Sequence, residues 1–311
     1  MDRIRIALVG VGKIARDQHL PALAADSGFE LVAAVSRHGP VQDIPTFSDI
    51  ASMIAGTAGE NALDAVSLCT PPSGRHALAC AAIEAGLHVM LEKPPGATVS
   101  EVIDLQTRAR ARGVTLFASW HSREAAGVAP ARSWLRESRI KSVSVAWKED
   151  IRVWHPGQHW ILEPGGLGVF DPGINALSIL THVLPGALTL QNATLSFPAN
   201  RHTPLAAELN FLHDGVAPVH VVLDFLQTGP QRWDIEIETD RGKLLLLAGG
   251  SRLKVDHNEH IAAPNREYSA LYSRFFSLIA ERKSDVDSTP LQHVADAFLL
   301  GRRLEIPAFE F

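Results

Sequence analysis

The chain has 311 residues, a formal net charge of -5 and an ordinary globular composition, with 46% hydrophobic and 20% charged residues. This composition excludes a disordered chain, and the acidic balance provides no field that would attract nucleic acid. No apolar run is long enough to span a bilayer and no secretory signal is recognisable, so we expect a cytoplasmic protein. The length exceeds what one hydrophobic core usually supports, and we expect two domains, at residues 1–122 and 123–311.

The first predicted strand leads into a glycine-rich turn. The stretch "IRIALVGVGKIA" is typical of an apolar strand, a turn at Gly10 and Gly12 that continues through Lys13 and Ile14, and a helix that begins near Ala15. In a dinucleotide-binding fold, such glycines let the backbone approach a pyrophosphate, whose charge then faces the positive end of the helix. A tight turn without a ligand is the alternative, and the glycines alone leave both open.

The segments that follow supply the structural context for this turn. The predicted strands "ELVAAVS", "DAVSLC" and "HVMLEK" alternate with helical segments, among them "RHALACAAIEAG". Strands and helices that alternate at this spacing indicate a parallel sheet with right-handed crossovers. We therefore expect residues 1–122 to form a Rossmann NAD(P)-binding domain.

The end of the second predicted strand favours NADP. A site that prefers NAD usually places Asp or Glu about twenty residues after the glycines, whereas this chain has Ser36, Arg37 and His38 there. Without that carboxylate a 2′-phosphate is not repelled, and the Arg37 guanidinium can pair with it. NADP is thus the expected cofactor, with NAD as the weaker one. The alternative is that Arg37 is a solvated loop charge.

Two further turns leave the predicted sheet at its carboxyl edge, where open parallel sheets bind ligands. The first is "CTPPSGRH", whose prolines make a stiff turn with few donors, and the second is "LEKPPG". They supply the remaining candidates for cofactor contacts: Thr70, Pro71, Pro72, His76, Glu92 and Lys93.

No metal site is expected from the sequence. Cys69 and Cys80 are eleven residues apart, without the spacing of a metal-ligand pair, and both are expected to be buried thiols. The spacings of His121, His155 and His159 likewise match no recognised ligand pattern.

The second domain is predicted to be an α/β domain with an open, mainly antiparallel sheet. In "KSVSVAWKED", alternate residues Val143, Val145, Trp147 and Glu149 share one face. The segments "LNFLHD", "VHVVLDFL", "RWDIEIETD" and "GKLLLLAG" follow through short turns, and an amphipathic closing helix is expected near residues 289–303. Helices can cover one face of this sheet. The other face is a candidate subunit interface, so we expect a homo-oligomer.

The motifs "GVGKIA", "CTPP" and "EKP", in this order, resemble the Gfo/Idh/MocA family of NAD(P)-dependent sugar oxidoreductases. The resemblance implies a Rossmann domain followed by a domain with an open sheet, and it places Lys93 beside the nicotinamide and the substrate. Nearly end to end, through segments such as "WKEDIRVWHPGQHWI" and "EPGGLGVFDPGINALSI", the chain is similar to the bacterial members that oxidise L-arabinose and D-galactose at C1.

One motif departs from the broad family. Most members carry DxGxH on a helix that faces the nicotinamide, and this chain has Asp171 and, four residues later, Asn175 in place of the histidine. Residues four apart project from the same side of a helix. The asparagine is the expected residue in the L-arabinose and D-galactose 1-dehydrogenases. A carboxylate that only stabilises the start of a helix is the alternative for Asp171.

The resemblance implies oxidation of an aldopyranose at the anomeric carbon to a lactone, with hydride transfer to the nicotinamide. Because an amide does not take up the proton, Asn175 can only form hydrogen bonds and position the sugar. Asp171 and Lys93 are the candidates to share the proton transfer and to stabilise the developing oxyanion. The expected substrate-binding residues, hydrogen-bonding groups and aromatic platforms, are His121, Glu149, Trp154, His155, Asp171, Asn175 and Trp233.

Two rival functions stay open from the sequence. Some family members bind nucleotide and a partner protein without chemistry, but such a sensor would not need both Lys93 and Asp171. The second rival is a dehydrogenase of the same type that acts on another sugar or on an inositol.

Overall fold

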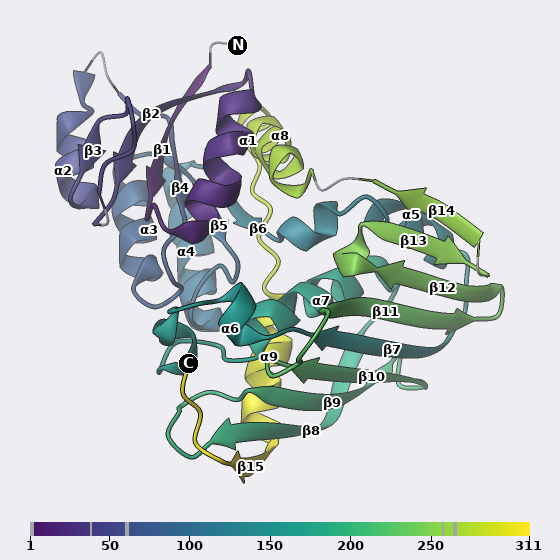
Figure 1. Cartoon of the computed structure of the whole chain (residues 1–311). Coiled ribbons are helices and arrows are strands. Elements are labelled where there is room, and N and C mark those ends of the chain that lie inside the picture. The colour runs from purple at the N-terminus through teal and green to yellow at the C-terminus, as the bar shows by residue number, and fades with distance from the viewer. Residues whose placement is uncertain (1–2, 38, 60–61, 257, 264–265) are drawn as a thin grey trace. The chain divides into compact units, whose positions relative to one another are not determined.

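The structure, a computed structural model, describes residues 3–37, 39–59, 62–256, 258–263 and 266–311. It divides into two compact units (Figure 1). The first comprises residues 1–120 and 267–288, and the second comprises residues 121–266 and 289–311. Within the described residues, none of the helices combines the length and the apolar character needed to cross a membrane.

The first unit is built on a parallel sheet of six strands in the order β3-β2-β1-β4-β5-β6, which confirms the predicted Rossmann-like fold. Its strands are β1 (Ile4–Val9), β2 (Phe29–Val35), β3 (Thr46–Phe47), β4 (Ala65–Leu68), β5 (His88–Glu92) and β6 (Leu116–Ser119). Ile6 and Leu8 of β1 enter one hydrophobic cluster, and Ala7 and Val9 enter the other. Both faces of the sheet are therefore covered, as a parallel sheet requires.

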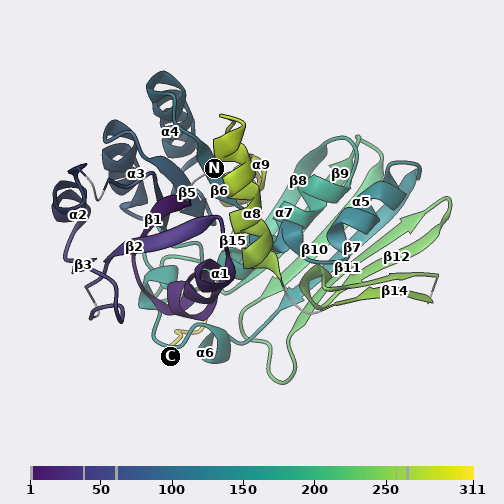
Figure 2. The ribbon, with the colours of Figure 1, turned by 90° about the horizontal axis from the view of Figure 1, so that it is seen from above.

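Helices cover the two faces of this sheet separately (Figure 2). One face carries α2 (Ile50–Gly56), α3 (Arg75–Glu84) and α4 (Val99–Arg112), and the other carries α1 (Leu20–Ala25) and α8 (Glu267–Ala280). The predicted second domain, residues 123–311, includes α8, and the structure corrects this boundary. The apolar side of α8, with Tyr272 and Phe275, packs instead against Phe29 of β2, and this packing makes residues 267–288 part of the first unit.

The second unit is a mixed sheet of nine strands in the order β14-β13-β12-β11-β7-β10-β9-β8-β15. Its ladders are antiparallel except for β7 with β10 and β8 with β15. The strands are β7 (Ile140–Lys148), β8 (Leu188–Pro198), β9 (Ala206–His213), β10 (Ala217–Asp224), β11 (Arg232–Thr239), β12 (Gly242–Leu247), β13 (Arg252–Val255), β14 (Asn258–Ala262) and β15 (Arg302–Ile306). The predicted alternation is confirmed, because Val143, Val145, Trp147 and Glu149 are all buried.

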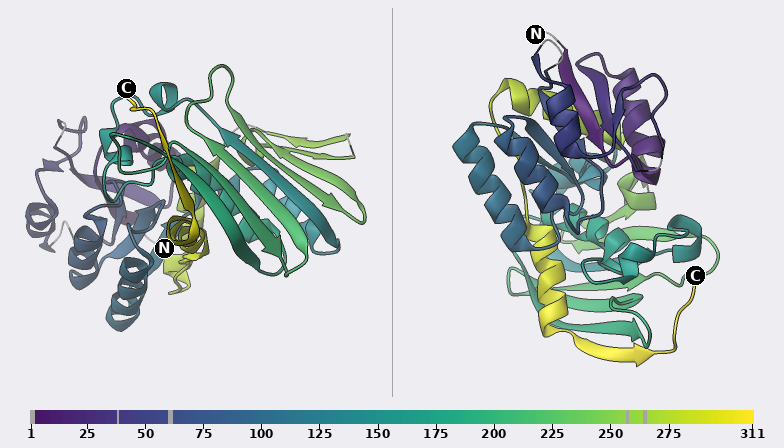
Figure 3. Two further views of the ribbon diagram at one scale, coloured as in Figure 1. Left: turned by 90° about the horizontal axis from the view of Figure 1, so that it is seen from below. Right: turned by 90° about the vertical axis from the view of Figure 1, so that its left-hand side faces the viewer.

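The longer helices of this unit are α5 (Val128–Leu135), α7 (Phe170–Val183) and α9 (Thr289–Leu300), which contact strands β12, β7 and β8 respectively. The closing helix was predicted to continue to residue 303, but it ends at Leu300, and residues 302–306 form β15 beside β8 (Figure 3). A side chain at Gly301 would collide with the Ala297 carbonyl oxygen and with Leu195. Glycine at this position lets the chain turn directly from the helix into the strand.

Candidate functional site

The glycine-rich turn leads from β1 into a helix and lies against the end of the neighbouring strand β4, at the point where the strand order reverses. Gly10 has a φ of +90°, and a Cβ there would lie 2.6 Å from Thr70 Cγ2 at the end of β4, so only glycine fits. A Cβ at Gly12 would meet nothing within 4 Å. This turn thus keeps its backbone accessible at the switch point, the place where open α/β sheets bind ligands. Lys13 and Ile14 lie exposed beside it.

The helix after the turn begins irregularly. Residues Ala15–His19 form a π-helical segment, η1, before α1 continues the helix. Ala15, in the third position of the glycine fingerprint, is fully buried in the core, which agrees with a role in close helix–sheet packing.

The turn after β4 also has a feature that suits a ligand. Thr70 Oγ1 is buried, and no hydrogen-bond partner reaches it among the described residues. A buried hydroxyl without a hydrogen-bond partner destabilises a folded protein. A ligand that forms a hydrogen bond with this hydroxyl would remove that penalty.

The segment predicted to select the cofactor follows β2. Ser36 is half-buried, its N–H donates to the Phe47 carbonyl oxygen at 3.0 Å, and Arg37 is exposed. His38 lies outside the described residues. The Arg37 side chain is therefore available to an anionic ligand.

A buried arginine that sequence reasoning missed braces the two other turns. Arg75, the first residue of α3, has 2% of its surface exposed. Its Nε donates to the Thr70 carbonyl oxygen at 3.0 Å, and its guanidinium also donates to the carbonyl oxygens of Glu92 and Pro94. One side chain thus ties the "CTPP" turn to the "EKP" turn. The only sign of this brace in the sequence is the arginine of "SGRH". Because an arginine at the start of a helix is ordinarily exposed, its burial is not predicted from the sequence.

The side chain of Glu92 is the centre of a buried hydrogen-bond cluster. His19 Nε2 lies 3.0 Å from Glu92 Oε1, Tyr268 donates to the same oxygen at 2.8 Å, and His19 Nδ1 lies 2.8 Å from the Tyr272 hydroxyl. The backbone N–H of Lys93 donates to Glu92 Oε2 at 2.9 Å. The cluster therefore links η1 and α8 to the backbone of the "EKP" turn.

Protonation of this cluster follows from burial and from the neighbouring groups. Burial alone lowers the pKa of His19, but Cys69, Tyr272 and the bond to Glu92 outweigh it, and the pKa of His19 is raised well above its usual value. Burial, and then the Glu92 carboxylate, raise the pKa of Tyr268 well above 10.0. His19 is thus an imidazolium paired with a carboxylate, and Tyr268 is a neutral donor.

The two cysteines, both predicted to be buried, differ in exposure. Cys69 is buried, as expected, whereas Cys80 is only half-buried. The ring of His76, an expected cofactor contact, is engaged with Asp104 of α4, at 2.8 Å between Nε2 and Oδ2.

In the second unit, Asp171 and Asn175 lie in the first two turns of α7, as their spacing predicts. Asp171 is almost fully buried, with 4% exposed, and Asn175 is half-buried. A Cβ at Gly173 would lie 2.5 Å from Leu223 Cδ1 of β10. Glycine between them therefore lets the start of α7 lie directly on the sheet.

A buried carboxylate, an imidazole and an indole are bonded together beside Asp171. Glu149 Oε1 lies 3.0 Å from His155 Nε2, and Glu149 Oε2 accepts from Trp233 Nε1 at 2.8 Å. The other ring nitrogen of His155, Nδ1, lies 3.8 Å from Asp171 Oδ2. Glu149, His155 and Asp171 thus lie in a row of groups that can exchange a proton, and the Trp233 indole is a fixed donor to Glu149 at one end of it.

The neighbouring polar and aromatic groups of this unit suit a polar ligand with an apolar face. Asn175 Oδ1 is buried, and no donor reaches it among the described residues. Trp154 is 39% exposed and packs edge-on against Trp233, with ring centroids 4.8 Å apart. The Trp233 indole is hydrogen-bonded to Glu149 and therefore holds that carboxylate in place. Trp154 is thus the ring that is open to a ligand.

Two further histidines of the second unit lie in short 3-10 helices. His121 begins the 3-10 helix η3 (His121–Glu124), which packs against α7. His159 in η4 (His159–Leu162) contacts the ring of Phe311, at 4.7 Å between centroids.

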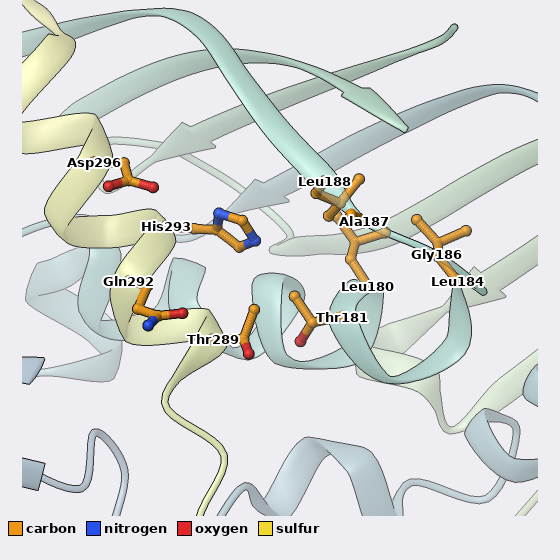
Figure 4. A pocket seen from close by; sticks show the side chains of 10 residues that line it. All are labelled: Leu180, Thr181, Leu184, Gly186, Ala187, Leu188, Thr289, Gln292, His293 and Asp296. Carbon is orange, nitrogen blue, oxygen red and sulfur yellow. The ribbon is translucent and has the colours of Figure 1, made fainter. Parts of the chain in front are cut away.

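A separate hollow of about 600 Å³ lies at the far end of α7 (Figure 4). Leu180 and Thr181 of α7 line it together with Gln292, His293 and Asp296 of α9. It contains none of the residues of the Glu149–His155–Asp171 row, so its size alone does not make it the reactive site.

Comparison with known proteins gives consistent results. The model of the Gfo/Idh/MocA family, described as an oxidoreductase family with an NAD-binding Rossmann fold, matches residues 4–119. The chain is 42% identical to galactose 1-dehydrogenase from Pseudomonas fluorescens, over 99% of both chains. The crystal structure of a D-galactose-1-dehydrogenase protein from Rhizobium etli superimposes with a TM-score of 0.94 at 51% identity, covering 100% of this chain and 99% of that one.

A more distant structure shares the fold alone. KijD10, a 3-ketoreductase from Actinomadura kijaniata, in complex with NADP and TDP-benzene, superimposes with a TM-score of 0.81 at 17% identity, over 98% of this chain and 100% of that one.

Proposed function

Because the chain belongs to the Gfo/Idh/MocA family of oxidoreductases, we propose that it oxidises an aldopyranose, D-galactose or L-arabinose, at the anomeric carbon to the lactone, with NADP or NAD as the acceptor. The two relatives with the highest identity above are named for galactose oxidation. D-Galactose and L-arabinose share the stereochemistry of their ring hydroxyls, so one hydrogen-bonding pattern serves both.

The observation that carries the proposal is the pairing of a buried carboxylate with a buried amide oxygen on α7. Asp171 adjoins His155, a group that can pass a proton onward, and Asn175 Oδ1 has no partner among the described residues. A sugar hydroxyl that donates to Asn175 would satisfy this oxygen. The missing histidine of the family motif is thus replaced by an amide that positions the sugar, while His155 supplies an imidazole from a different segment.

The reaction removes a hydride and a proton from the sugar, and the two go to different acceptors. The nicotinamide, when bound, accepts the hydride from C1 of the sugar. The C1 hydroxyl loses its proton as the carbonyl of the lactone forms, and we assign that proton to Asp171, with Lys93 stabilising the developing negative charge. His155, hydrogen-bonded to Glu149, then takes the proton from Asp171, and its partly exposed ring releases it to water.

The first unit offers the features needed to hold the dinucleotide. The accessible backbone at Gly12 and the start of the following helix suit the pyrophosphate. The unbonded Thr70 hydroxyl, Pro71, Pro72 and the "EKP" turn extend the same edge of the sheet. Exposed Arg37 is assigned to the 2′-phosphate, so NADP is the preferred form.

The preference for NADP can be tested at one residue. Arg37→Asp should lower kcat/KM with NADP by about 10- to 100-fold, the effect of a lost charge-assisted hydrogen bond, while NAD is affected far less. Initial rates with both cofactors measure this effect, and Arg252→Asp, a change of an exposed arginine on β13, serves as the control. Equal losses with both cofactors would show that Arg37 does not contact the phosphate.

The proposed reaction is tested by initial rates of nicotinamide reduction with D-galactose, L-arabinose, D-glucose and myo-inositol, each with NADP and NAD. We expect fast reduction with the first two sugars, and NMR of the product should show the lactone before it hydrolyses. Binding of NADP without reduction by any of the four compounds would contradict the proposal and favour a sensor. Turnover of myo-inositol or D-glucose alone would reassign the substrate.

We also propose that the chain forms a homo-oligomer through the sheet face opposite α5, α7 and α9. On that face, half-buried Ala146, Leu212 and Val222 lie among polar side chains. Light scattering after size exclusion tests the assembly, and Val222→Arg should shift it toward the monomer. A monomer in the unaltered protein would contradict it.

A further inference from the structure

Outside the proposed catalytic groups, a second set of reactive side chains meets between α3 and α4. His76 and Cys80 are four residues apart on α3 and therefore project from the same side of the helix. Asp104 of α4 faces them. Among the described residues these three form one group whose donor atoms, one nitrogen, one sulfur and one oxygen, all lie within 4.8 Å of one another.

The distances are close to those of a tetrahedral zinc site. Zinc bonds of about 2.3 Å to sulfur and about 2.0 Å to nitrogen place those two ligand atoms about 3.6 Å apart. Cys80 Sγ lies 3.6 Å from His76 Nε2. The 2.8 Å contact between His76 Nε2 and Asp104 Oδ2 would lengthen by about 0.5 Å as the metal replaces the shared proton.

We propose that His76, Cys80 and Asp104 bind one Zn²⁺ ion and thereby join α3 to α4, in addition to the proposed dehydrogenase function and independently of it. A thiolate, an imidazole and a carboxylate form a donor set that suits zinc, and all three side chains are only partly buried, so the ion and a water as fourth ligand can enter.

The charges around the group are compatible with a divalent cation. A thiolate and a carboxylate neutralise Zn²⁺. The Arg108 guanidinium, 2.7 Å from Asp104 Oδ2, is itself paired with Glu84 at 3.3 Å. Arg108 therefore orients the Asp104 carboxylate through the same oxygen that faces His76, as outer hydrogen-bond partners do for metal ligands, and Glu84 offsets its charge.

Metal binding at this group must depend on pH. Burial raises the pKa of Cys80, with Asp104 and Glu84 adding to the effect and Arg108 opposing it. Zinc therefore has to displace a thiol proton when it binds. Affinity should rise with pH, with proton release on binding.

The experiment uses the full-length chain without a polyhistidine tag and with its thiols reduced. Titration with Zn²⁺ should give one ion per chain and raise Tm by about 4 °C or more at a hundredfold excess over Kd. Titration with Co²⁺ should produce a thiolate-to-metal charge-transfer band and intense visible bands of a tetrahedral site.

Variants distinguish the proposed ligands from accidental ones. Cys80→Ser should abolish the charge-transfer band and weaken zinc binding at least tenfold, and His76→Gln should weaken it similarly. Cys80→His should keep zinc bound but lose the band. Cys69→Ser, which removes the other thiol, should change neither.

Circular dichroism of the metal-free variants verifies their folding, and His76→Gln gives an independent test if Cys80→Ser does not fold. Zinc binding that is unchanged in both variants, or a cobalt complex of the unaltered chain without a thiolate band, would overturn the proposal. Because zinc binding is measured without sugar or nucleotide, this result does not depend on the proposed dehydrogenase activity.

Discussion

Each unit contains a histidine bonded to a buried glutamate, and the two pairs have different surroundings. In the first unit, His19 is fully buried, and Tyr272 and Glu92 bond to its two ring nitrogens. In the second unit, the His155 side chain is 18% exposed and has Glu149 at one nitrogen and Asp171 at 3.8 Å from the other. The first pair is enclosed by protein, whereas the second is next to groups that a ligand can reach.

This contrast separates a structural role from a chemical one. An enclosed ion pair stabilises the turn that carries Lys93, because Glu92 also accepts from the Lys93 backbone. His155, whose side chain keeps contact with solvent and lies beside Asp171, can exchange protons during a reaction.

The largest effect is expected at Asp171. Asp171→Asn should lower kcat with D-galactose by about 10²- to 10⁴-fold, because the amide cannot take up the hydroxyl proton. Tm should change little, since the replacement has the same size. Steady-state kinetics and thermal unfolding measure the two quantities, and Asp240→Asn in an exposed turn is the control. A variant with near-normal kcat would remove Asp171 from the proton transfer.

A large loss of stability is expected when the enclosed pair is broken. Glu92→Leu leaves the imidazolium of His19 buried without its carboxylate and should cost about 3–5 kcal/mol in the free energy of unfolding. Glu149→Leu should cost less, because water can still reach His155. Urea unfolding of both variants gives the comparison. If the loss is larger at Glu149, the contrast between the two pairs is wrong.

A smaller and specific effect is expected at Asn175. Asn175→Ala should raise KM for D-galactose by about 10- to 100-fold, the effect of one lost hydrogen bond to a buried partner, without lowering stability. Asn210→Ala, which removes an amide bonded to Asn192 on β8, should leave KM unchanged. Lower stability with an unaltered KM would instead assign Asn175 to the structure.

The smallest effect is a pH dependence of stability that originates at His19. Because the pKa of His19 is raised in the folded state, that state binds the proton more tightly than the unfolded one. The resulting stabilisation is complete below pH about 6.5, the pKa of an unperturbed histidine, and is lost as pH rises through the folded pKa. The free energy of unfolding, measured in urea from pH 6 to 9, should fall less steeply in His19→Gln.

Local patterns were sufficient for much of the fold. The turn at Gly10 and Gly12, the parallel first sheet and the alternation along β7 were all predicted, and the structure confirms them. The spacing of Asp171 and Asn175 was sufficient to place them together on α7. Each of these features is determined within a few residues, by backbone sterics at glycine or by the periodicity of a strand or helix.

Long-range contacts decided the rest. His19 and Tyr268 reach Glu92 from 73 and 176 residues away, and Glu149 and Trp233 meet across 84 residues. The same holds for Arg75, whose burial depends on two turns that fold around it. It holds also for α8, which belongs to the first unit because its apolar side covers the sheet of that unit. Periodicity shows that a side chain is inside, but only the assembled sheet and helices determine which other side chains it contacts there.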